Sequence, residues 1–209
     1  MEKEIRQCQN GRVEFKFFDY GLHRTPENMS KAIQVEIDRV NEEEYDGIIL
    51  GYGLCSNGIV GVHSHRHRLI VPRAHDCITL FLGSPESYKS QSVKHPGTYY
   101  LTPGWIEKGE TPLSKYGSYA KSYGEETARW VLHEEMKHYT RIAVIDTGVY
   151  PLEPYQKIAI QNAKFLGISY EELKGSPYFF KELVAGPWEK DFLIIEKGYS
   201  IQQDMFFDL

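Results

Sequence analysis

Short apolar runs alternate with polar loops and with segments of helical periodicity along most of the chain. Apolar runs at 47–50, 69–71, 98–101, 142–145 and 192–195 predict strands, as does the segment VEFKFF at 13–18. Helices are predicted from Pro26 to Val40, behind a Thr25 N-cap, and in the stretches 128–139 and 153–166. Strands and helices in alternation predict an α/β fold with a mainly parallel central sheet.

The same patterning predicts a single α/β domain that spans residues 1–209. The stretch at about 107–123 is rich in glycine, proline and tyrosine. It is expected to form an excursion over one face, as a lid or interface arm. After Gly167 the periodicity weakens, and an irregular C-terminal part is expected around the last strand.

Composition narrows the class of protein. The chain is 41% hydrophobic and 25% charged, which is typical of a soluble globular protein. A net charge of −5 provides no electrostatic footprint for nucleic acid or an anionic membrane. No apolar run is long enough to span a bilayer, and no leader peptide is evident. Three cysteines, an odd number, argue against a disulfide framework and favour a cytoplasmic protein.

Candidate metal ligands follow two of the predicted strands. Cys55 lies in the loop after the first apolar run, and His75 and Cys77 lie in the loop after the second. If these strands are parallel neighbours, both loops meet at the carboxyl edge of the sheet, where α/β proteins bind ligands. His23 closes another strand-end loop and is a candidate fourth ligand. Thiolate and imidazole suit zinc first, with iron or cobalt as alternatives. Buried structural cysteines and a reactive thiol are the competing interpretations.

A wider set of residues is expected to line a ligand site, and each member has a structural alternative. Arg73 would clamp a carboxylate or phosphate, or pair with an aspartate. Trp105 would form a wall or pack in the core, and Asp146 would face the site or cap a helix. The glycine loop from Gly51 to Gly58 resembles a phosphate cradle without the usual spacing or lysine. The candidate ligand-binding residues are Gly53, Ser56, Asn57, Arg73, Trp105 and Asp146.

Three histidines alternate at positions 63, 65 and 67. In an extended backbone they would share one face, which is a possible arrangement for metal binding. Arginine and serine residues lie between and beside them, so a solvent-exposed turn is the favoured interpretation.

Several longer strings resemble a known prokaryotic family, domain of unknown function 1638. They are GYGLCSNG, PRAHDCITLFLGS, GTYYLTPGW and the strand-end Asp146-Thr147-Gly148, with PRAHDC the most specific. The resemblance implies a Rossmann-like layered fold. It also implies an association with anaerobic one-carbon metabolism, in which a corrinoid is a candidate cofactor and a corrinoid methyltransferase system a candidate partner. Members of the family tend to begin with a further strand that ends in a cysteine, and the chain lacks a match to it.

Three hypotheses follow for the function. The first is a protein that binds a metal or metallocofactor through Cys55, His75 and Cys77 and serves methyl-group or thiol chemistry. The second is a nucleotide- or S-adenosylmethionine-binding enzyme that uses the loop from Gly51 to Gly58. The third is a non-catalytic accessory module for a small-molecule ligand or a corrinoid. These hypotheses include both enzymatic and non-catalytic roles, and a homo-oligomer is a candidate assembly.

Overall fold

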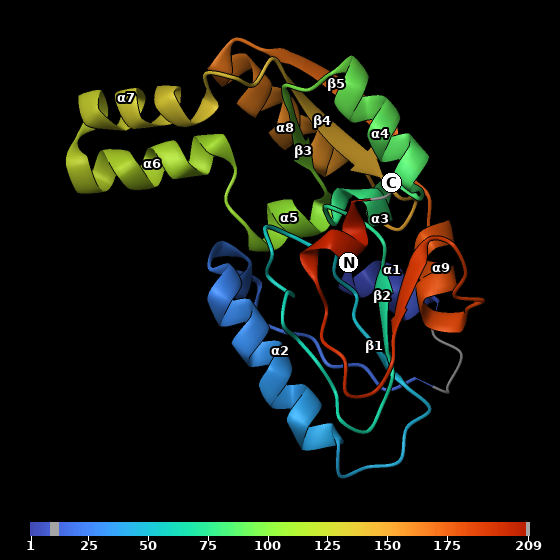
Figure 1. Ribbon diagram of the computed structural model, residues 1–209. Coiled ribbons are helices and arrows are strands. Elements are labelled where there is room, and N and C mark those ends of the chain that lie inside the picture. Colours follow the sequence, from blue (N-terminus) through green and yellow to red (C-terminus); the bar gives the residue numbers. More distant parts are fainter. Residues whose placement is uncertain (9–12, 208–209) are drawn as a thin grey trace. The chain divides into compact units, whose positions relative to one another are not determined.

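The computed structural model describes residues 1–8 and 13–207, with the backbone alone at positions 23 and 24. The described residues divide into two compact units, formed by 1–88 with 176–209 and by 89–175. Each unit has its own three-stranded sheet (Figure 1). The described residues thus combine helices and strands and include one small parallel sheet, but the expected single central sheet is replaced by two small ones.

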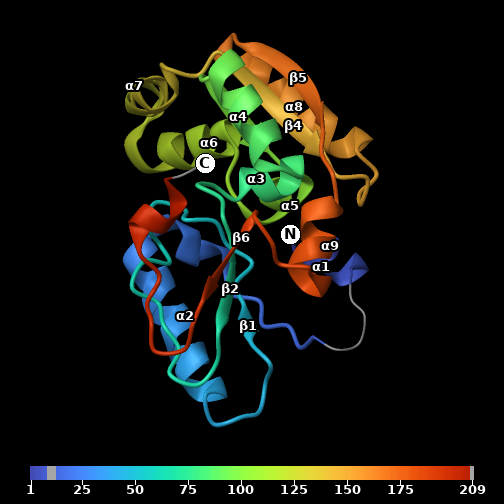
Figure 2. The same cartoon turned by 45° about the vertical axis from the view of Figure 1, so that its right-hand side comes forward.

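The first unit holds what we call the mixed sheet, in the order β1-β2-β6. β1 runs parallel to β2, with Ile48 opposite Leu69, and β6 runs antiparallel to β2, with Ile195 opposite Leu69. Figure 2 shows these strands side by side, with α2 along one side of them. The elements of this unit are α1 (Glu2–Gln7), η1 (Tyr20–Arg24), α2 (Pro26–Val40), β1 (Ile48–Ile49), β2 (Leu69–Pro72), α3 (Ile78–Leu82), α9 (Tyr178–Ala185), β6 (Phe192–Ile195) and η2 (Gln203–Phe206).

The second unit holds the parallel sheet, in the order β3-β4-β5. Its central strand β4 buries every residue but the last, as expected for a strand with a neighbour on each side. Helix α4 (Pro85–Lys94) leads from the first unit into the second. The other elements are β3 (Thr98–Leu101), α5 (Pro103–Lys108), α6 (Pro112–Tyr123), α7 (Glu125–Met136), β4 (Arg141–Asp146), α8 (Glu153–Leu166) and β5 (Ser169–Lys174).

Helix α2 forms for the reasons that its sequence predicts. Thr25 occupies the N-cap position in an extended conformation, and Pro26 takes the first helical position. Met29, Ile33 and Ile37 repeat at helical spacing and are buried. They pack in the core of the first unit together with Leu69 and Val71 of β2. This packing anchors one side of the mixed sheet.

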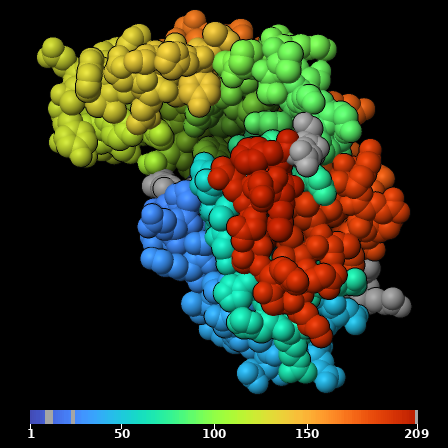
Figure 3. All heavy atoms as spheres, viewed as in Figure 1, coloured from blue at the N-terminus to red at the C-terminus, as the bar shows by residue number. Residues whose placement is uncertain are grey.

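The C-terminal part is more regular than expected. β5 joins the parallel sheet, α9 buries Phe179 and Phe180, and β6 completes the mixed sheet. Beyond β6, the Ile201 amide donates to the Val62 carbonyl, and the Gly61 amide donates to the Ile201 carbonyl. The space-filling view shows this C-terminal segment (red) beside the atoms of the β1–β2 region (turquoise) (Figure 3). Ile201 and Phe206 are thus part of the first unit's core.

Two further segments differ in backbone conformation from what the sequence suggests. Residues 13–18 form no strand, although Phe15 and Phe17 do share a side and stack at 6.0 Å between ring centroids. The Arg6 guanidinium lies 4.9 Å from the Phe17 ring centroid, so the alternating face packs near α1 instead of pairing with a strand. The excursion at 107–123 is mostly the regular helix α6, which packs against α7 as a helical hairpin (Figure 1).

The capping pattern explains why α6 is regular. The Thr111 side chain accepts the Ser114 amide, and the Ser114 side chain accepts the Thr111 amide, which makes a capping box. Pro112 takes the first helical position. These local signals outweigh Gly117 in the middle of the helix. In the part of the chain that is described, no helix combines the length and the apolarity needed to cross a membrane.

Candidate functional site

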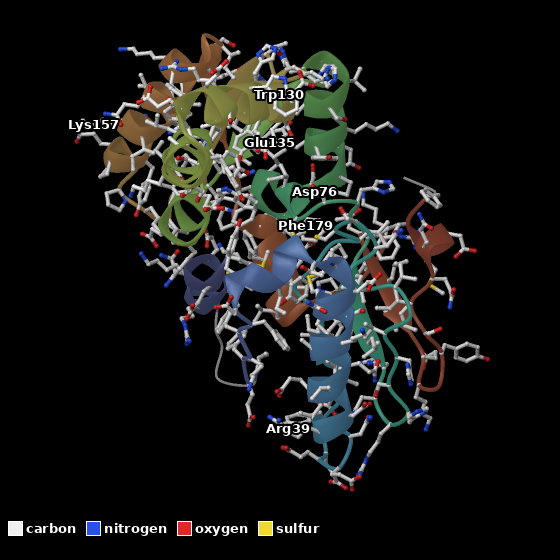
Figure 4. The ribbon with its side chains drawn as sticks, turned by 90° about the vertical axis from the view of Figure 1, so that its left-hand side faces the viewer. Arg39, Asp76, Trp130, Glu135, Lys157 and Phe179 are labelled. Atoms are coloured by element: carbon white, nitrogen blue, oxygen red, sulfur yellow. The ribbon has the colours of Figure 1, made fainter. Side chains whose placement is uncertain are left out.

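The loops that follow β1 and β2 are hydrogen-bonded to each other beyond the ends of the strands. The Leu54 amide donates to the Ala74 carbonyl at 2.7 Å, and the Cys55 amide donates to the His75 carbonyl at 3.1 Å. Asp76, labelled in Figure 4, lies in the second of these loops, where its side chain accepts the Ile78 amide at the start of α3. The two cysteine-bearing loops are therefore held together by their backbones.

Gly53 is required for this close approach. A Cβ atom at Gly53 would lie 2.8 Å from the Ala74 carbonyl oxygen and 3.0 Å from the Asp76 carbonyl carbon. Both are backbone atoms, which cannot move aside as the end of a flexible side chain can. The Gly53 amide also donates to the Cys77 sulfur. A glycine at this position thus allows the first loop to lie directly on the second.

The backbone at Cys55, Ser56 and Asn57 adopts an uncommon conformation. These three consecutive residues have φ angles of 46°, 57° and 67°. For L-residues the left-handed helical region costs about 1–2 kcal/mol per residue, so the turn is strained. The Gly58 amide closes it by donating to the Leu54 and Cys55 carbonyls. The turn leaves Ser56 and Asn57 exposed and directs Cys55 into partial burial.

The turn brings Cys55 against Cys77, as the strand-end positions of the two residues predict. Their sulfur atoms are 2.9 Å apart, with either able to donate, and the two residues are thiols, not a disulfide. Cys77 is buried at 8% exposure, and Cys55 is half-buried. Tyr52 completes the group: burial, followed by the charges of Cys77 and Cys55, raises its pKa to about 12. We refer to Tyr52, Cys55 and Cys77 as the thiol cluster.

The other predicted site residues whose side chains are described do not join the thiol cluster. His75 is exposed, and its ring centroid lies 6.0 Å from that of Phe207, so its ring is not part of the thiol cluster. His23 lies in η1, and its side chain is outside the described part of the chain. Within the described part of the chain, the Arg73 Nε is buried without a hydrogen-bond partner, and the Arg73 backbone amide donates to the Asp191 carbonyl.

Trp105 and Asp146 belong to the second unit, at the carboxyl ends of β3 and β4. The Trp105 indole donates to the Glu110 carbonyl, and the Asp146 side chain accepts the Gly148 amide within its own loop. Asp146 does not cap a helix, because α8 begins only at Glu153. A single central sheet would have placed the ends of all these strands at one edge. Instead, Gly51 and Arg73 follow strands of the mixed sheet, and Pro103 and Asp146 lie at strand ends of the parallel sheet.

The three alternating histidines lie in different environments. The rings of His63 and His65 meet edge to face with centroids 4.9 Å apart. His67, in contrast, is buried at 4% exposure, and its Nε2 contacts the Glu43 carbonyl at 3.1 Å. The expected exposed turn is therefore wrong for His67. Across the described residues, no group of three or more His, Cys, Asp or Glu side chains is arranged to hold a metal ion.

Most of the chain, including the loops that carry the thiol cluster, matches a known family of proteins. A model of the family described as "Protein of unknown function (DUF1638)" matches residues 17–184, which include the whole thiol cluster. The chain belongs to the DUF1638 family. Comparisons of this DUF1638 protein with curated proteins and with solved structures give no match.

Two features of the site were not predicted from sequence. One is the left-handed turn, for which Asn57 is a local signal, because asparagine tolerates this conformation better than most other residues. The other is the contact between the Gly53 amide and the Cys77 sulfur, which depends on the register of the two loops and has no signal in either loop alone.

The environment of Cys77 leads to a prediction about pH. The hydrogen bond with Cys55, then burial, then the charges of Cys55 and Asp76 raise the pKa of Cys77 well above its ordinary value, and the Gly53 amide opposes them only in part. Above about pH 9 the unfolded chain loses this proton while the folded chain keeps it, so stability falls as pH rises. We therefore expect the free energy of unfolding to fall between pH 9 and pH 10 in chelator-treated protein. The fall should be larger than in the Cys77→Ala variant by up to about 1.4 kcal/mol.

Chemical denaturation at closely spaced pH values checks this expectation. Only the difference in slope between the two proteins matters, so a lower overall stability of Cys77→Ala does not affect the test. Measurements below pH 10 limit the contribution of Tyr52 to the pH dependence of stability. The raised pKa of Tyr52 would also lower the stability as pH rises, but at higher pH. Identical slopes would show that the folded protein does not retain the Cys77 proton.

Proposed function

We propose that this DUF1638 protein binds a thiophilic metal ion or metallocofactor through Cys55 and Cys77. The observation that carries the proposal is the contact of the two sulfurs at 2.9 Å, held by paired loops at the carboxyl edge of β1 and β2. Two cysteines on separate, hydrogen-bonded loops supply the soft ligands that zinc, iron and cobalt accept.

The donor set fits a metal if the two thiols lose their protons and separate slightly. With metal–sulfur bonds of about 2.3 Å, two thiolates of a tetrahedral zinc site lie about 3.8 Å apart. The present separation is about 0.9 Å shorter, which a rotation of the half-buried Cys55 side chain would accommodate. The described residues offer two ligands here, which leaves coordination positions for a bound small molecule, or for His75 if its ring turns away from Phe207.

An open coordination position favours chemistry over a purely structural role, because structural zinc sites are closed by four protein ligands. When bound, such a metal would polarise or deprotonate a coordinated thiol or water. The residues of the chain would hold the site: the Gly53 amide would support the Cys77 thiolate, and Tyr52 would supply a neutral phenol beside it. The association with corrinoid-dependent methyl transfer, implied by the family resemblance, is part of the same proposal.

The alternative of a nucleotide or S-adenosylmethionine site receives less support. Dinucleotide-binding loops present a phosphate to the N-terminus of the helix that follows them. Residues 50–68, all of which are described, contain turns and no helix. A Rossmann-like class remains part of the proposal for the parallel sheet, where β3, β4 and β5 follow in order with helical crossovers.

Metal content tests the proposed function. We expect protein purified without an affinity tag, or supplied with zinc, iron(II) or cobalt(II), to hold a metal ion that Cys55→Ser and Cys77→Ser lose. Cys8→Ser is the matched control, because Cys8 lies in α1's C-cap, where its thiol contacts the Glu4 carbonyl. Elemental analysis gives the metal per chain, and cobalt–thiolate absorption reports the ligand type.

Two histidine variants test whether an imidazole also binds the metal. His75→Ala should weaken binding if this imidazole completes the site, whereas His63→Ala should not. Full metal content in both Cys55→Ser and Cys77→Ser would refute the proposed function. Parallel titrations with aquacobalamin and with S-adenosylmethionine distinguish a corrinoid site from the alternative, since only the first predicts a spectral change that depends on Cys55 and Cys77.

A further inference from the structure

The sulfur atoms of Cys55 and Cys77 are already close to bonding distance. Their separation of 2.9 Å exceeds the disulfide bond of about 2.05 Å by roughly 0.9 Å. The surrounding backbone keeps the two loops paired through the Leu54–Ala74 and Cys55–His75 hydrogen bonds. Each thiol therefore meets the other at a high effective concentration without rearrangement of the loops.

The two thiols differ in access. Cys77 is 8% exposed, and the Gly53 amide contacts its sulfur. Cys55 is half-buried and is followed by the exposed residues Ser56 and Asn57. A reagent arriving from solvent meets Cys55 first, and Cys77 lies directly behind it. This arrangement of an accessible thiol with a buried one in contact is suited to thiol–disulfide exchange.

We propose that Cys55 and Cys77 form a dithiol centre that reduces low-molecular-weight disulfides, with Cys55 as the entering thiol and Cys77 as the resolving thiol. This activity goes beyond metal binding and does not depend on it. In this proposal the left-handed turn has a role, because its strained backbone holds the Cys55 thiol against Cys77.

The exchange is balanced in two steps. The Cys55 thiolate attacks one sulfur of a disulfide RSSR, so that a Cys55–S–SR bond forms and RS⁻ leaves. The Cys77 sulfur then attacks the Cys55 sulfur, the bond to the second RS breaks, and the Cys55–Cys77 disulfide remains. The two protein thiols lose two electrons and two protons, and RSSR becomes two RSH. A dithiol reductant in solution reverses the reaction.

The experiment uses the full chain in the Cys8→Ser background after chelator treatment, with glutathione disulfide as the probe. We expect intact mass to show the loss of two hydrogens without a lasting adduct, and peptide mapping to show a Cys55–Cys77 crosslink. Adding Cys77→Ala should trap a single glutathione adduct on Cys55. Adding Cys55→Ala instead should slow modification at least about tenfold, because the remaining thiol is buried.

Peptide mapping of the Cys8→Ser protein keeps the test decisive if a Cys77 variant does not fold, which thermal unfolding would reveal. Glutathione adducts on both cysteines without a crosslink would overturn the proposal, as would equal modification rates in the Cys55→Ala and Cys77→Ala proteins. A parallel experiment with added zinc separates the two proposals. If zinc slows the formation of the crosslink, metal binding at Cys55 and Cys77 is supported. If the crosslink forms equally fast with zinc present, the result counts against metal binding but not against the dithiol centre.

Discussion

Replacing Gly53 with alanine is expected to lower the free energy of unfolding of the first unit by about 1–3 kcal/mol and to separate the two thiols. The added Cβ would lie 2.8 Å from the Ala74 carbonyl oxygen and 3.2 Å from the Asp76 amide nitrogen. All the nearest atoms are backbone atoms of the opposing loop, so one loop must move. Metal binding and crosslinking at Cys55 and Cys77 should weaken together.

Gly117→Ala is the matched control for this substitution. Gly117 lies within α6, and a Cβ there would meet nothing within 4 Å. Alanine in a helix interior is favoured over glycine by up to about 1 kcal/mol, so the control is expected to be neutral or stabilising. Denaturant unfolding, with thiol labelling of Cys55 as a local probe, measures both effects. Equal stabilities of the two variants would contradict the tight contact of the loops at Gly53.

Removing the carboxylate of Glu171 is expected to destabilise the parallel sheet by about 1–3 kcal/mol. Its partner Arg141 starts β4 with a side chain only 4% exposed, and it also donates to the Thr98 hydroxyl and the Gln91 amide oxygen. Breaking a fully buried ion pair costs about 3–5 kcal/mol, and the 46% exposure of the Glu171 side chain reduces that figure through solvent screening.

Glu171→Gln keeps the shape of the side chain and removes its charge, and Glu134→Gln is the surface control. Glu134 pairs with Lys137 where both side chains are 43% exposed, so solvent screens the pair and its loss should leave the stability nearly unchanged. Hydrogen exchange at the β4 amides measures the stability of the second unit separately. This separation is needed because the two units need not unfold together. Exchange that is equally fast in both variants would show that Arg141 does not depend on Glu171.

The sequence predicts the elements whose signals are local. Met29, Ile33 and Ile37 show the buried face of α2, and the apolar runs before Cys55 and Arg73 mark β1 and β2. The contact of Cys55 with Cys77 was predictable because parallel neighbours end at the same edge of a sheet. These inferences needed only spacing and the polarity of the residues.

Features that depend on a distant partner were missed. Residues 13–18 alternate as a strand would, but a strand requires a neighbouring edge, and β1 pairs with β2 instead. The α6 helix was hidden by Gly117, although Thr111 and Pro112 carried its start signal. The direction of the His75 ring, toward Phe207, depends on where the chain end packs and could not be inferred from the loop itself.

The first unit is discontinuous in sequence, and this determines the order in which it can be completed during synthesis. β2 receives β1 early, but its other neighbour β6 is made only after the entire second unit has emerged. Domains fold as units while the chain is synthesised, so the parallel sheet can form before the mixed sheet is finished. A nascent chain therefore carries Cys55 and Cys77 on a β1–β2 pair in which β2 still lacks its second neighbour, and it reaches its final arrangement only when β6 is added.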